Sequence, residues 1–119
     1  MTLTRQVPAA SNVVQHAVDL VVATHPDRPE APETVRRYVR FGASPRGAQA
    51  LVLAAKATAL LDGRPNASSA DVRSMAPAAL RHRLVLGYEA VADGVVADGV
   101  VAAVLAAVPE PPAGIRGAP

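Results

Sequence analysis

The chain has 119 residues, a hydrophobic fraction of 50% and a formal net charge of +2 that results from 12 basic and 10 acidic residues. This length suits one domain with one core, and so small a net charge does not indicate nucleic-acid binding. With no cysteine and only three histidines, the chain lacks the ligands for disulfide scaffolds, zinc ribbons, iron–sulfur clusters and thiolate chemistry. The aromatic fraction of 3% leaves mostly small and branched aliphatic side chains, which favours a helical bundle.

The first predicted helix covers about residues 12–24, with Ser11 as its N-cap. Its valines and alanine recur at helical spacing on one face. Three prolines then break the pattern and predict a solvated loop over residues 25–32. Residues 34–41 alternate basic and apolar side chains, a pattern that fits a short strand and a helical turn equally well.

A second helix is predicted over residues 45–62, because Ser44 is a suitable N-cap, Pro45 suits the first helical position and Gly63 is a helix-ending residue. Its many alanines allow neighbouring helices to approach closely, which is typical of a central helix. The third helix is predicted over residues 69–83, opened by a capping box of Ser68 and Asp71. We expect it to be interrupted after Met75, with Pro77 starting a new turn.

Residues 84–92 are expected to be extended or irregular, and the valine spacing after them predicts a last helix over residues 97–108. The proline-rich and glycine-rich tail, residues 109–119, is predicted to be disordered. Together these elements predict an all-α fold: a small bundle of about four main helices in one domain, residues 1–108, with short irregular or extended connectors.

Several kinds of chemistry are disfavoured by the motifs. The only lysine, Lys56, is flanked by alanines and not by the residues of a P-loop. The segment 42–46 is close to a nucleophile elbow, but Arg46 replaces its final glycine and Pro45 removes an amide that an oxyanion hole would use. The most apolar stretch, residues 95–108, is shorter than the roughly 20 residues of a membrane span. With no targeting signal visible, we expect a cytoplasmic location and no membrane partner.

Arg46 is the principal candidate for a binding role. It falls in the first turn of the second predicted helix, where acidic residues are preferred by roughly 0.3–1 kcal/mol over basic ones. A cation at this position is useful if an anion such as a phosphate binds there. The residues are equally consistent with a merely solvated Arg46.

The same region carries a family resemblance. Residues 39–51, 55–57, 61–64, 70–72 and 77–84 closely resemble the small C-terminal lid domain of MoxR-type AAA+ ATPases. The resemblance implies that Arg46 is the sensor-2 arginine, which reaches the γ-phosphate of ATP bound in a preceding ATPase domain. It further implies that Ser44, Pro45 and Gly47 border the nucleotide.

By this resemblance the parent protein is a chaperone-like ATPase. Its implied cofactors are ATP and Mg²⁺, which the parent protein binds and the isolated chain does not. The implied partners are its upstream ATPase domain, neighbouring subunits of a ring and von Willebrand A-type proteins. Because the P-loop and Walker B acids are missing here, we expect no ATP hydrolysis by this chain alone.

Further arginines are candidates for an interface. Arg36, Arg37 and Arg40 form either a basic face toward nucleotide or a neighbouring subunit, or a solvated face. His82 and Arg83 either contact the ATPase core or bond the carbonyls at a helix end. A rival interpretation is a small helical nucleic-acid-binding protein, which the low charge and few aromatics oppose. In a third, a pure protein-interaction bundle, Arg46 would be dispensable.

Overall fold

The computed structural model describes residues 6–111, so the predicted disorder of residues 112–119 lies outside the described residues. Its elements in chain order are α2 (Ser11–Val22), α3 (Glu33–Tyr38), β1 (Val39–Phe41), α4 (Pro45–Leu61), α5 (Ser69–Leu80), β2 (Val85–Leu86), α6 (Tyr88–Ala92) and α7 (Ala97–Ala107). The predicted all-α class is confirmed, since the two strands form only a small two-stranded sheet. Among the described helices, none is long and apolar enough to cross a membrane.

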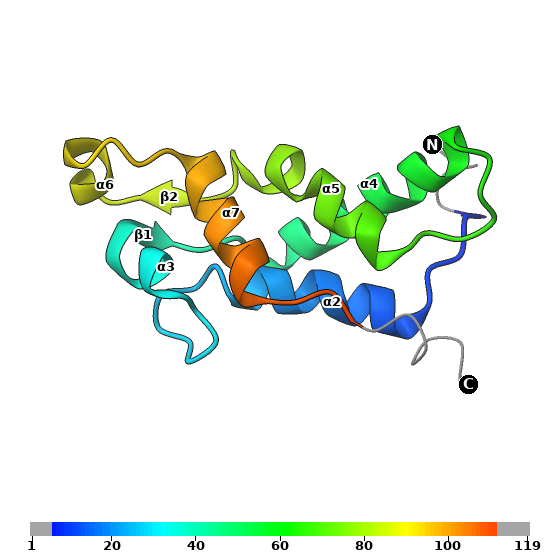
Figure 1. Ribbon diagram of the computed structural model, residues 1–119, viewed down its shortest axis with the longest axis horizontal. Helices are drawn as coiled ribbons and strands as arrows, with labels where there is room; N and C mark the ends of the chain where they lie inside the picture. The colour runs from blue at the N-terminus through cyan, green and yellow to red at the C-terminus, as the bar shows by residue number, and fades with distance from the viewer. Residues whose placement is uncertain (1–5, 112–119) are drawn as a thin grey trace.

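The molecule is elongated, with extents of 44 × 29 × 20 Å. Helices α2, α4 and α5 pack against one another and α7 crosses them, while α3, β1, β2 and α6 form one end (Figure 1). The core is built from fully buried leucines and valines, among them Leu20, Leu51 and Leu80. Ala55 and Ala59 on α4 are also fully buried, which lets α4 and α5 approach closely as expected of a central helix.

The local signals for α4 are confirmed. Ser44 is its N-cap and Pro45 is its first residue, while the helix ends at Leu61 with Gly63 following at a φ of +70°. The capping box at the start of α5 is also present, because the Asp71 amide bonds the Ser68 side chain and the Ser68 amide bonds the Asp71 carboxylate. Arg64 adds two bonds to Asp71, of 2.8 and 2.7 Å. This guanidinium holds the pKa of the buried Asp71 carboxyl below its usual range.

Three expectations need correction. Ala10, and not Ser11, is the N-cap of α2, and the helix ends at Val22. Helix α5 continues through Pro77 and ends at Leu80, because burial of the flanking Ala76 and Leu80 outweighs the lost hydrogen bond at the proline.

Residues 84–92 are predicted to be extended or irregular: the extended strand β2 at Val85–Leu86 agrees with this prediction, whereas the short helix α6 does not. Residues 34–41, for which both a strand and a helical turn were open, contain α3 followed by β1. The two strands are antiparallel, with Val39 opposite Leu86 and Phe41 opposite Val85. Each strand is too short to be stable alone, so their pairing explains both assignments.

Candidate functional site

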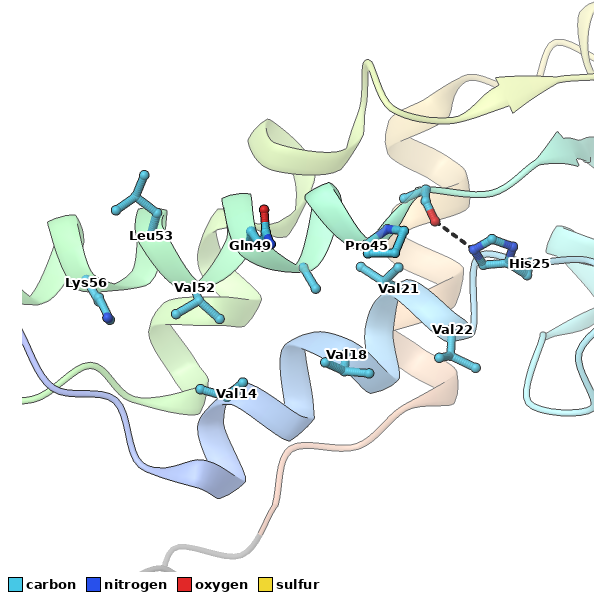
Figure 2. Close-up of a pocket in the computed structure, with 12 residues that line it drawn as sticks. Val14, Val18, Val21, Val22, His25, Pro45, Gln49, Val52, Leu53 and Lys56 are labelled. Atoms are coloured by element: carbon cyan, nitrogen blue, oxygen red, sulfur yellow. Dashed lines mark hydrogen bonds between the residues drawn. The ribbon is translucent and has the colours of Figure 1, made fainter. Parts of the chain in front are cut away.

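The loop that leads from β1 into α4 is anchored to the end of α2. The Ala43 amide donates to Thr24 Oγ1 over 3.0 Å, and His25 Nε2 donates to the Ala43 carbonyl over 2.6 Å. The dashed line in Figure 2 marks the second of these bonds. Thr24 Oγ1 in turn donates to the carbonyl of Val21. Both main-chain polar groups of Ala43 are therefore tied to α2, which sets where α4 begins.

Two glycines allow this close attachment. A Cβ atom on Gly42 would lie 2.6 Å from the Thr24 carbonyl oxygen, so only a hydrogen atom fits there. A Cβ atom on Gly47 would lie 3.1 Å from Ala43 Cβ and 3.3 Å from Leu80 Cδ2. The first turn of α4 is thus fixed against α2 on one side and the end of α5 on the other.

The main-chain amides of this turn have partners of their own. Ser44 Oγ accepts from the Arg46 amide over 3.3 Å, and the Ser44 carbonyl accepts from the Gly47 amide over 2.8 Å. Pro45 has no amide hydrogen, and Gly47 is buried. Attraction of an anion to this end of α4 therefore rests on the Arg46 guanidinium more than on free amides.

The side chain of Arg46 is exposed. Within residues 6–111, its guanidinium has no hydrogen bond, ion pair or ring contact. Four of the other arginines in this part of the chain meet carboxylates: the pairs are Arg28 with Glu30, Arg37 with Glu89, Arg64 with Asp71 and Arg81 with Asp98. Arg46 is thus held at a defined helix end with its charge available to an external anion.

The predicted basic face of Arg36, Arg37 and Arg40 is divided among structural contacts. Arg36 donates to main-chain carbonyls of the loop 28–31, at 3.0 Å for Ala31. Arg37 lies 2.8 Å from a Glu89 carboxylate oxygen, which holds α3 against α6. Arg40 lies over the ring of Phe41 at 5.5 Å. Arg36 and Arg37 therefore stabilise this end of the fold and do not form a free cationic surface.

His82 and Arg83 follow the end of α5 beside the start of α4. Arg83 Nε donates to the Ala79 carbonyl over 3.1 Å, which is the helix-end contact that the sequence left open as one of two alternatives. The side chain of His82 is exposed. The proximity of Leu80 to Gly47 brings this segment near the turn that carries Arg46.

An apolar groove of about 700 Å³ runs between α2 and α4 (Figure 2). Val14 and Val18 of α2 line it with 39% and 37% of their surface exposed, and Val52 lines the α4 side. Pro45 also lines the groove, so the groove reaches the turn of α4 that carries Arg46. The candidate site therefore combines an exposed cation with an adjoining apolar surface.

Thr24 and His25 are site-positioning residues that the sequence reasoning did not identify. Thr24 was assigned to the first helix, and His25 to the solvated loop that follows it. The sequence signal for this anchoring role is that two residues able to donate and accept hydrogen bonds directly follow the apolar face of the first helix. Their partner, Ala43, lies 19 residues after Thr24 and 18 after His25, so no local pattern reveals it.

Comparison with known proteins supports the resemblance to MoxR-type lid domains. The family model of the AAA lid domain matches residues 31–104. Over 108 residues the chain is 42% identical to Chaperone MoxR1 of Mycobacterium tuberculosis, covering 87% of this chain and 29% of that protein. Protein MoxR of Paracoccus denitrificans is 39% identical over 79 residues, or 65% of this chain and 23% of that protein.

A crystal structure of a candidate ATPase from Cytophaga hutchinsonii superimposes with a TM-score of 0.85 at 28% identity. The match covers 93% of this chain and 34% of that one. The chain thus spans less than a third of the length of both MoxR proteins.

Proposed function

The chain belongs to the AAA lid domain family and is the lid of a MoxR-type AAA+ protein, and on this premise we propose that it senses nucleotide bound to an ATPase domain. In this proposal the lid unit extends over residues 1–108, and Arg46 contacts the γ-phosphate of ATP as a sensor-2 arginine. The observation that carries the proposal is the exposed Arg46 guanidinium, which has no partner within residues 6–111.

The geometry around Arg46 supports a role in sensing. Ser44 and Pro45 are exposed beside it and border the nucleotide in this proposal, whereas the buried Gly47 provides close packing. Because Ala43 is bonded to Thr24 and His25 at the end of α2, a force on Arg46 acts on both α4 and α2. A phosphate that binds Arg46 would therefore reorient the lid as one body and not move a single side chain.

The groove between α2 and α4 supplies the second contact of the proposed lid. It reaches the turn that carries Arg46, and the two MoxR relatives contain more than twice as much sequence outside the matched segment as within it. We assign the covering of this groove to the ATPase domain of the parent protein. Burial of Val14 and Val18 on closure would contribute a favourable hydrophobic term.

The parent protein in this proposal binds ATP and Mg²⁺ in its ATPase domain, forms a ring with neighbouring subunits and acts as a chaperone-like ATPase, with von Willebrand A-type proteins among its partners. The lid itself would hold no metal. Its contribution is a positive charge delivered to the transferring phosphoryl group when the lid is closed.

The test is the steady-state ATPase rate of the parent protein that contains both domains. We expect Arg46→Ala to lower kcat at least about tenfold, because charge developing on the phosphoryl group loses a stabilising cation. Arg28→Ala is the matched control, because the exposed side chain of Arg28 contacts only Glu30 within residues 6–111; it should leave the rate within about twofold of the wild type. Unchanged turnover of a folded Arg46→Ala protein would contradict the proposal.

A further inference from the structure

Two segments far apart in the sequence run side by side next to the proposed site. Phe41 of β1 lies opposite Val85 of β2, and Leu80 at the end of α5 lies against Gly47 near the start of α4. β1 and β2 are therefore antiparallel neighbours (Figure 1), and the segments that continue from them toward α4 and from α5 come close again at Gly47 and Leu80.

Exposed basic and apolar side chains occur together on these segments. We call them the basic-apolar strip, which consists of Arg40, Phe41, His82, Arg83 and Val85. Phe41 and Val85 are 59% and 50% exposed although they form a cross-strand pair. Such exposure of a paired aromatic and aliphatic residue is typical of a surface that a partner covers.

The cations of the strip are not neutralised within the described part of the chain. Neither Arg40 nor Arg83 meets a carboxylate there, whereas Arg37 on the adjacent α3 meets Glu89 and Asp93. Arg83 is steadied by its bond to the Ala79 carbonyl and Arg40 by the ring of Phe41. The strip thus carries an arginine beside each strand of the apolar pair: Arg40 next to Phe41 in β1, and Arg83 two residues before Val85 of β2.

We propose that the basic-apolar strip binds a protein surface in which carboxylates surround an apolar centre. The apolar pair needs an apolar counterpart, and the uncompensated arginines need acidic ones. A nucleic acid fits the strip less well, because Arg40 lies over the Phe41 ring at 5.5 Å, where a base would stack. The net charge of +2 is also small for a phosphate-tracking surface. This interaction goes beyond the proposed role of Arg46, since it requires no nucleotide.

The experiment follows backbone amide shifts of the isotope-labelled full chain during titration with three probes. The first is a short helical peptide with leucines on one face and glutamates on both sides of it. The second is the same peptide with lysines in place of the glutamates, and the third is oligothymidine of similar length. We expect only the glutamate peptide to shift residues 39–47 and 80–86 saturably, with weaker binding as salt is raised.

Variants locate the interaction. The double variant Arg40→Glu with Arg83→Glu should weaken binding of the glutamate peptide at least about tenfold, and Val85→Ser should weaken it severalfold. Arg28→Glu reverses an exposed charge away from the strip and should change the Kd by less than about twofold. If the double variant does not give the dispersed spectrum of a folded chain, Arg83→Gln replaces it, with a smaller loss expected.

Several results would overturn the proposal. These are shifts outside the two segments, no saturable shift at millimolar glutamate peptide, or equal binding by the double variant and the wild type. Equal binding of the lysine peptide would show that carboxylates are not needed. Binding of oligothymidine to the same residues with equal or higher affinity would identify a nucleic-acid surface instead. Concentration-dependent shifts of the strip without any probe would identify a second copy of the chain as the occupant. Since no nucleotide is present, the outcome is independent of the Arg46 ATPase test.

Discussion

Replacement of Gly42 by alanine tests whether the close attachment of the loop to α2 positions α4. The added methyl carbon would lie 2.6 Å from the Thr24 carbonyl oxygen and 2.8 Å from Thr24 Oγ1. An ordinary contact requires roughly 3.5 Å. The nearest of these atoms belongs to the main chain of a fully buried residue, so a side-chain rotation cannot relieve the clash.

The size of the effect follows from the displacement required. The loop and the end of α2 must separate by roughly 1 Å, and such overpacking costs about 1–3 kcal/mol. The bond from the Ala43 amide to Thr24 Oγ1, now 3.0 Å, would lengthen beyond useful range, which costs about 1 kcal/mol more. We therefore expect Gly42→Ala to lower the free energy of unfolding by about 2–4 kcal/mol.

Urea unfolding of the full chain, followed by far-ultraviolet circular dichroism, measures this difference. The matched control is Gly99→Ala in α7, where a Cβ atom would meet nothing within 4 Å. Because alanine is the better helix former, Gly99→Ala should raise the free energy of unfolding by about 0.5–1 kcal/mol. If Gly42→Ala is as stable as the wild type to within about 0.5 kcal/mol while the control behaves as expected, the loop does not depend on this contact.

Three other predictions concern the isolated chain. Arg46→Ala should change the free energy of unfolding by no more than about 0.5 kcal/mol in the same urea assay, because the side chain is exposed and without a partner in residues 6–111. A larger loss would show a structural role. Burial, and then the nearby Arg73, lower the pKa of His16 below its ordinary value of 6.5; stability should be constant above about pH 6.5 and fall below it as the unfolded chain takes up a proton. His16→Leu should remove most of this slope in urea unfolding between about pH 7 and pH 5, and an unaltered slope would exclude His16 as its source. In a phosphate-release assay the purified chain should show no ATP hydrolysis with Mg²⁺, and sustained turnover by a clean preparation would contradict this expectation.

The helices were largely predictable from the sequence because their signals act over a few residues. Ser44 and Pro45 start α4, Gly63 follows its end, and the capping box of Ser68 and Asp71 starts α5. Each signal satisfies main-chain groups within one helical turn, so no distant contact is needed. The position of Arg46 in the first turn of α4, and hence its candidacy as a phosphate ligand, follows from the same local rules.

Other features depend on contacts between distant residues. Helix α5 continues through Pro77 because tertiary burial of its neighbours outweighs a local penalty. Residues 85–86 are a strand because β1 lies beside them. Whether an arginine is available to a partner is likewise a tertiary property. Arg37 is neutralised by Glu89, which is 52 residues away.

Local sequence signals therefore specify the helical class and the helix end that carries Arg46. Only the tertiary structure decided that Thr24 and His25 anchor that end, and that Arg46 and Arg83 lie on neighbouring segments without carboxylate partners within residues 6–111. The physical reason is the separation along the chain over which each interaction acts. Capping and helix periodicity act through hydrogen bonds between near neighbours, whereas ion pairing, groove formation and strand pairing depend on which distant surfaces the packed core brings together.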